Sequence, residues 1–153
     1  MEIRKTNPND LPFHQFDIYC QAFVGAAWTD LCMVNVCEKE LKIVKGDADS
    51  EILIMKVHPY ITININMDDM DGWDDLIRTL CHELGHCVTF QYRQFQIIHA
   101  HEQEDEHCLI HEQFAMRFAN TCMSCGLAEK WDKVAYDLII RESKDAKKAN
   151  QSS

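Results

Sequence analysis

His82-Glu83-Leu84-Gly85-His86 is the stretch of this 153-residue chain that says most about its fold and chemistry. On a helix, residues four apart lie one turn apart on the same face, so the imidazoles of His82 and His86 can bind one metal ion. Glu83, on the adjacent flank, can reach a water in the open position of that metal. The spacing predicts a helix that carries two zinc ligands and a general base.

The residues around this motif predict the helix that would carry it. The segment 71–75 supplies an N-cap and acidic residues for a first turn, which suit the helix dipole. Gly85 costs about 1 kcal/mol relative to alanine inside a helix, so it indicates that another segment packs close to the backbone there. Apolar residues recur at helical spacing and would bury one side, namely Leu76, Ile77, Leu80, Leu84 and Val88.

A catalytic zinc site usually has three protein ligands, so a third is expected beyond the two histidines. Glu112 is the preferred candidate, because it lies in a helical pattern with Ala115, whose small side chain would let that helix approach the motif helix closely. His101 and His111 are the alternatives. His111 neighbours Glu112, and adjacent helical residues point about 100° apart, so only one of these two is expected to bind the ion.

The remaining sequence predicts an α+β fold in a single domain spanning residues 1–153. Asn9-Asp10 before a proline predicts the start of an N-terminal helix that runs to about residue 28. Four short strands are expected to form a small, mostly antiparallel twisted sheet, at 32–37, 41–45, 51–57 and 60–66. Two C-terminal helices are expected at about 106–122 and 129–147, with Gly126 between them and a frayed tail from about residue 149.

Residues 60–66 alternate apolar and polar side chains, which predicts a half-buried strand. Its polar face would carry Thr62, Asn64 and Asn66. If this strand lies at an edge of the sheet, its backbone can bind an extended peptide by β-strand addition, and these three residues become candidate substrate-binding groups. A strand paired on both sides for purely structural reasons is the alternative.

Two motifs together resemble the ImmA/IrrE family of metallopeptidases. In that family a strand precedes the HELGH helix, and a later E-x-x-A-x-x-F-A segment supplies the third zinc ligand. Here the second motif reads Glu112-Gln113-Phe114-Ala115-Met116-Arg117-Phe118-Ala119, and the resemblance covers roughly residues 51–123. SprT-like proteases, which have a third histidine some way after the second, are the rival resemblance and would favour His101 as the ligand.

The resemblance implies a zincin-like fold and a zinc endopeptidase that acts on a protein or peptide substrate, with a regulatory protein as one candidate. It implies Zn²⁺ as the cofactor, bound by His82, His86 and Glu112, with Glu83 as the catalytic base. Two alternatives remain open from the residues. One is a non-catalytic protein of zincin fold that binds a partner through an acidic surface. The other is a zinc hydrolase of a non-protein amide.

Composition limits the class of protein further. The chain has 25 acidic and 15 basic residues and a formal net charge of −10, which argues against non-specific nucleic-acid binding. No apolar run approaches membrane-spanning length and the first residues lack the apolar core of a signal peptide, so a cytoplasmic protein without membrane contact is expected. The 8 cysteines are then expected as free thiols. The sequence leaves the oligomeric state open.

Overall fold

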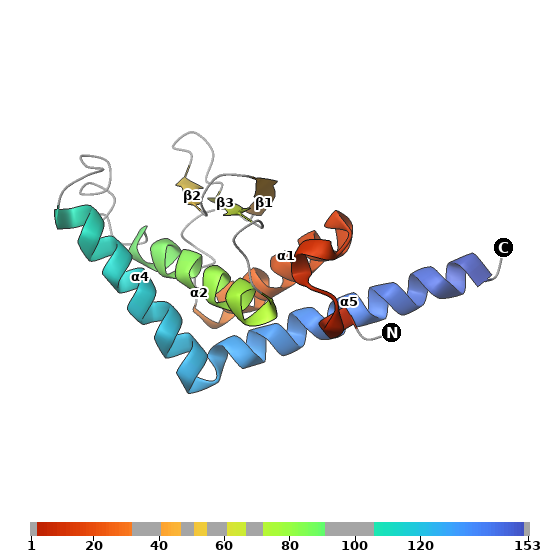
Figure 1. Ribbon diagram of the computed structural model, residues 1–153. Helices are drawn as coiled ribbons and strands as arrows, with labels where there is room; N and C mark the ends of the chain where they lie inside the picture. Colours follow the sequence, from red (N-terminus) through yellow and green to blue (C-terminus); the bar gives the residue numbers. More distant parts are fainter. Residues whose placement is uncertain are drawn as a thin grey trace.

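Four α-helices form most of the part of the chain that the computed structural model describes (Figure 1). The described backbone comprises residues 3–31, 41–46, 51–54, 61–66, 72–90 and 106–151. In chain order its elements are η1 (Ile3–Lys5), η2 (Pro8–Asp10), α1 (Phe13–Asp30), β1 (Leu41–Gly46), β2 (Glu51–Ile54), β3 (Ile61–Asn66), α2 (Trp73–Phe90), α4 (Glu106–Cys125) and α5 (Leu127–Gln151).

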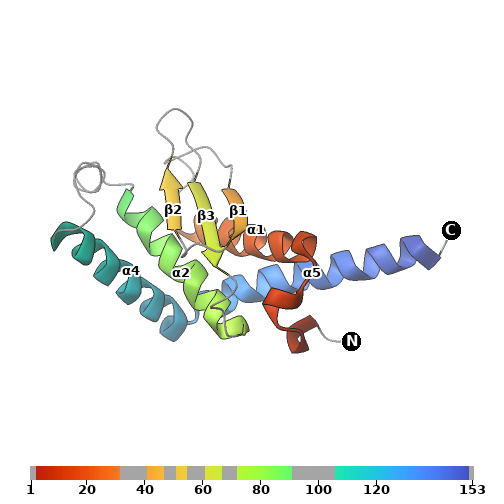
Figure 2. The same ribbon diagram turned by 45° about the horizontal axis from the view of Figure 1, so that its top comes forward.

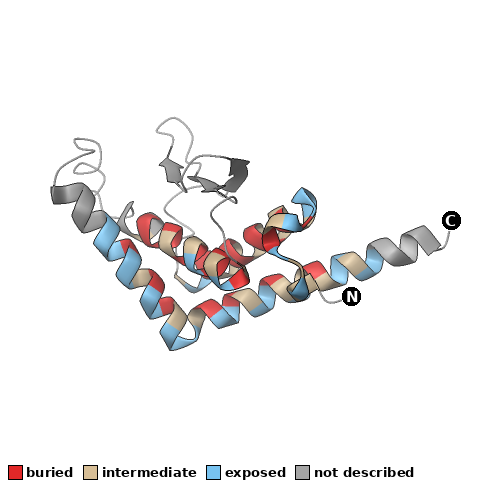
Figure 3. Cartoon of the chain, viewed as in Figure 1, coloured by how far each residue is buried: buried red, intermediate tan, exposed pale blue. Residues whose placement is uncertain are grey.

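The helices pack mainly as two pairs, α1 against α5 and α2 against α4 (Figures 1 and 2). Gly126 separates α4 from α5, and its φ of 92° is a conformation that glycine adopts at little cost. The two helices therefore meet in a sharp corner. Buried residues, drawn in red, lie along the helix faces that contact one another (Figure 3). The largest fully buried apolar side chains are Phe16, Tyr19, Phe23, Leu76, Leu80, Leu84, Trp131 and Ile139.

The predicted α+β fold with a mostly antiparallel sheet was wrong. Apart from Leu11, every buried residue of the described core belongs to one of the four helices. The three strands have the order β1-β3-β2, with β1 parallel to β3 and β2 antiparallel to it. The described body of the protein is helical because amphipathic helices bury their apolar faces against one another.

β3 lies between the other two strands, so the edge position considered for residues 60–66 was also wrong. Residues 61–64 pair with β1 on one side and with β2 on the other. A peptide cannot add to a strand whose backbone is already paired on both sides. Substrate binding by Thr62, Asn64 and Asn66 stays a prediction, without the support of β-strand addition. The strand expected at 32–37 and residues 55–57 lie outside the described residues.

The start of the first α-helix and the end of the last one differ from the predicted boundaries. α1 begins at Phe13, not directly after Asn9-Asp10. The Asn7 side chain instead accepts a hydrogen bond of 3.0 Å from the Asn9 backbone and opens η2, and the extended backbone of Leu11 then separates η2 from α1. At the other end, the tail expected to fray is helical to Gln151.

Arg4 joins the N-terminal segment to α2 and α5. Its guanidinium donates to both carboxylate oxygens of Asp132, at 3.1 and 2.9 Å, and lies over the rings of Trp73 and Tyr136. The Tyr19 hydroxyl donates to the same carboxylate at 2.5 Å. Burial, followed by the nearby Asp132 charge, raises the pKa of Tyr19 well above its usual range. The phenol of Tyr19 therefore stays protonated and donates to Asp132 over the whole pH range in which the protein is handled.

Two predictions from the sequence, on membrane crossing and on the state of the cysteines, can be compared with the described residues. Within the described residues, no helix combines the length and the apolar character that crossing a membrane requires. The described cysteines, which are Cys20, Cys81, Cys122 and Cys125, are free thiols, as predicted.

We expect Asp132→Ala to lower the free energy of unfolding by about 2–4 kcal/mol, because the substitution leaves a buried phenol and a partly buried guanidinium without their shared acceptor. Urea denaturation followed by circular dichroism measures the loss. Asp137→Ala, which removes an exposed acid from the same helix, is the matched control and should change stability by no more than about 0.5 kcal/mol. Equal stability of the two variants would contradict the structural role of the Asp132 network.

Candidate metal centre

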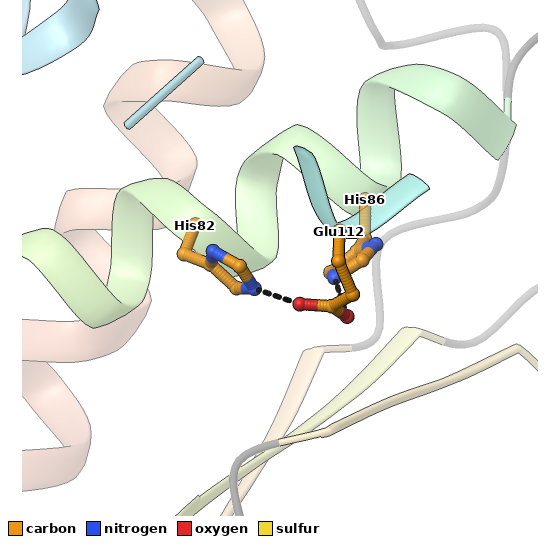
Figure 4. Close-up of side chains that lie close together, drawn as sticks. All are labelled: His82, His86 and Glu112. Atoms are coloured by element: carbon orange, nitrogen blue, oxygen red, sulfur yellow. Dashed lines mark hydrogen bonds and ion pairs between the residues drawn. The ribbon is translucent and has the colours of Figure 1, made fainter. Parts of the chain in front are cut away.

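His82 and His86 lie one turn apart on α2, and Glu112 of α4 lies between their rings (Figure 4). One carboxylate oxygen of Glu112 is 3.1 Å from Nε2 of His82, and the other is 3.0 Å from Nε2 of His86. The two imidazole side chains are 23% and 11% exposed, whereas the Glu112 side chain is 49% exposed. The cluster therefore lies at the surface, with its histidines largely enclosed and its carboxylate open to solvent.

These donor atoms fit a zinc ion. Two imidazole nitrogens and a carboxylate oxygen are a usual ligand set for catalytic zinc. In a tetrahedral site with bonds of about 2.0–2.2 Å, two ligand atoms stand about 3.4 Å apart. The observed separations of 3.1 and 3.0 Å join different carboxylate oxygens to the two histidines, so the Glu112 side chain would have to shift to admit an ion between the three groups. The three ligand atoms all lie within 4.8 Å of one another, and no other described residues form such a group.

Gly85 allows α2 and α4 to approach closely enough for this contact. A methyl group added at Gly85 would lie 2.8 Å from Cα of Ala115 and 3.2 Å from Cβ of Phe118. Real Cβ atoms essentially never come so close to a backbone atom, and the sequence prediction of a close neighbour at Gly85 is confirmed. Ala115 follows Glu112 by three residues and shares its helix face, so the same contact carries Glu112 over the two histidines.

Two further contacts hold the antiparallel pair α2 and α4 together toward the other end of α4. Nη1 of Arg78 donates to Oδ1 of Asn120. The thiols of Cys81 and Cys122 are hydrogen-bonded to each other, which raises the pKa of Cys81 well above its usual range and lowers the pKa of Cys122. These contacts fix the register of α4 along α2. They therefore also fix the position of Glu112 along the axis of α2, relative to the histidines.

Glu83 is buried beside this cluster, with 2% of its surface exposed. With His82, it lines a pocket of about 280 Å³. The other described residues of the pocket are Asp75, Arg78 and Thr79. Glu83 is therefore next to a metal-ligating candidate in the chain and is one of the residues that line this pocket.

The structure brings together four of the residues that the sequence singled out. It does not describe the side chains of two others. His82, Glu83, His86 and Glu112 form one site, whereas His101 and the side chain of His111 lie outside what is described. Sequence reasoning did not single out Arg78 as a residue of the pocket. Its position four residues before His82 was the available signal, because that spacing puts both on one helix face.

Comparisons of the chain with protein-family models, with curated proteins and with solved structures found no match. The resemblance to the ImmA/IrrE family therefore depends on the two sequence motifs alone and stays a prediction.

We expect Gly85→Ala to lower the free energy of unfolding by about 1–3 kcal/mol, because the added methyl group forces α2 and α4 apart. Gly25→Ala is a matched control in α1, where an added Cβ meets nothing within 4 Å. That variant should be more stable than the wild type by about 0.5–1 kcal/mol, the usual gain for replacing a helical glycine. Urea denaturation of both proteins tests the contrast, and a stabilised Gly85→Ala protein would show that the helix contact is not tight.

Proposed function

We propose that this protein is a zinc-dependent peptidase that hydrolyses a peptide bond in a protein or peptide substrate. The observation that carries the proposal is that ligand atoms of His82, His86 and Glu112 lie within 4.8 Å of one another, with the buried Glu83 adjacent to His82 in the chain. Among the described residues three groups can hold the ion, and three ligands leave one position of a tetrahedral metal for a water or a substrate oxygen.

The residues have distinct roles in this proposal. His82, His86 and Glu112 would hold the ion, which when bound supplies a Lewis acid and lowers the pKa of water to about 7. Glu83 would take a proton from the attacking water and deliver it to the leaving amine. Its burial supports a fixed position for this side chain, and Glu83 lines the pocket in which the scissile bond would lie.

The four described free cysteines also bear on the cellular compartment in which this activity would occur. Thiols persist in reducing compartments, whereas secreted proteins usually convert neighbouring thiols to disulfides. Cys81 and Cys122 are hydrogen-bonded neighbours, and both are free cysteines. We therefore propose a cytoplasmic location for the peptidase.

Metal content tests the ligand assignment. We expect close to one zinc ion per chain in wild-type protein purified without chelators, and a sharp loss in Glu112→Ala, because two histidines hold zinc poorly without a third ligand. Glu129→Ala removes an exposed acid from α5 and should leave the zinc content unchanged. Elemental analysis gives the three values. Equal zinc in wild type and Glu112→Ala would transfer the third ligand to a histidine, and no zinc in folded wild type would refute the metal site.

Hydrolysis tests the role of Glu83. Glu83→Gln should bind zinc as the wild type does but cleave peptides at least about 100-fold more slowly, because the amide cannot accept the proton of the attacking water. Incubating each zinc-loaded protein with a mixed peptide library, and identifying products by mass spectrometry, measures the difference. Cleavage by Glu83→Gln at the wild-type rate would refute the proposed mechanism while leaving the zinc site intact.

A further inference from the structure

The pocket beside Glu83 extends from the candidate metal centre toward the N-terminal end of α2. Its described lining residues all come from this helix, and Asp75, Arg78, Thr79 and His82 recur at spacings of three or four, which place them on one face. A group bound in this pocket would therefore lie within one or two helical turns of the proposed metal ligand. That position is suited to a substrate side chain or terminus next to the scissile bond.

Arg78 is the cation among the described residues that line this pocket. Asn120 of α4 accepts a hydrogen bond from its Nη1 and so orients the guanidinium. Because the asparagine side chain is neutral, it holds Arg78 in place without cancelling its positive charge. A guanidinium has five N–H donors in a fixed plane, a geometry that matches the two oxygens of a carboxylate.

Acidic groups surround Arg78, and its positive charge therefore affects which substrate groups the pocket can bind. The chain carries a formal net charge of −10, and the neighbouring Glu83 and Glu112 add negative charge at the centre itself. A bound zinc ion would offset the charges of Glu83 and Glu112, and Arg78 would add a further positive charge in the pocket. Asp75 lines the same pocket, so a carboxylate would be attracted to the Arg78 end and repelled from the Asp75 end.

We infer that this pocket is a specificity subsite in which Arg78 binds a carboxylate of the substrate. The inference builds on the proposed peptidase function and names its substrate class: peptides with a carboxylate next to the scissile bond. Two sources have this chemistry, an acidic side chain and the free C-terminus of the peptide. The first makes the protein an endopeptidase that cleaves beside aspartate or glutamate, and the second makes it a carboxypeptidase.

Three hydroxamate-capped peptides test this subsite without requiring turnover. Each binds zinc through the hydroxamate, and they differ only in the residue that follows, which is glutamine amide, glutamate amide or glutamine with a free carboxyl group. Isothermal titration calorimetry with the zinc-loaded protein gives the affinities. We expect at least one charged probe to bind about tenfold more tightly than glutamine amide, as a charge-assisted bidentate pair would produce.

Variants of the pocket identify the residue responsible. Arg78→Gln keeps a donor for Asn120 but loses the charge, and its preference for a charged probe should fall to within about twofold. Asp75→Asn is the opposite control and should bind the charged probes about two- to threefold more tightly than the wild type. The charged probe with the higher affinity identifies the source of the carboxylate.

The outcomes separate this inference from the proposed function. If the zinc-loaded protein binds all three probes equally, or if Arg78→Gln retains the preference, the subsite is overturned and the zinc centre stands. If folded wild-type protein takes up no zinc and binds no probe, both are overturned. Circular dichroism of Arg78→Gln confirms that any loss of preference occurs in a folded protein.

Discussion

The close approach of α2 and α4 at Gly85 is the constraint on which the candidate metal centre depends. A methyl group at this position would come within 2.8 Å of the backbone of Ala115. The axes of packed helices stand about 8–10 Å apart, farther where the side chains at the contact are larger, and packed interiors transmit such displacements because they contain few voids. An increase of even 1–2 Å would remove Glu112 from hydrogen-bonding distance of His82 and His86, which it now contacts at 3.1 and 3.0 Å. Gly85, the smallest residue of the motif, thus decides whether Glu112 of α4 reaches the two histidines of α2.

The rest of the helical scaffold holds α4 at this distance. The corner at Gly126 fixes where α5 begins, and α5 is in turn attached to α1. Oδ2 of Asp30, at the end of α1, accepts hydrogen bonds of 2.9 Å from both Lys130 and Trp131. The hydrogen bond from Lys130, followed by the one from Trp131, lowers the pKa of Asp30 below its usual value. Together with the Arg4 network at Asp132, these contacts connect the N-terminal segment and α1 to α5, the helix that follows α4.

Most of the residues of the proposed site lie on α2. That helix carries two candidate ligands, the candidate base Glu83 and the pocket residue Arg78, whereas Glu112 lies on α4. Groups on one rigid helix keep their relative positions without further support, which favours a site formed before its substrate binds. The donor atoms of the three candidate ligands already lie within 4.8 Å of one another without a metal ion.

The sequence by itself determined the local geometry. His82 and His86 share a helix face because helical periodicity depends only on nearby residues, and Gly85 indicated a close neighbour without identifying it. The tertiary structure decided which segment that neighbour is, because the distance between two helices depends on all the side chains that separate them. The alternation in residues 61–66 predicted a strand but not its neighbours, since alternation describes the two faces of a strand and not its two edges. The helical core was missed for the same reason: apolar spacing shows which side of an element is buried, and only packing shows what buries it.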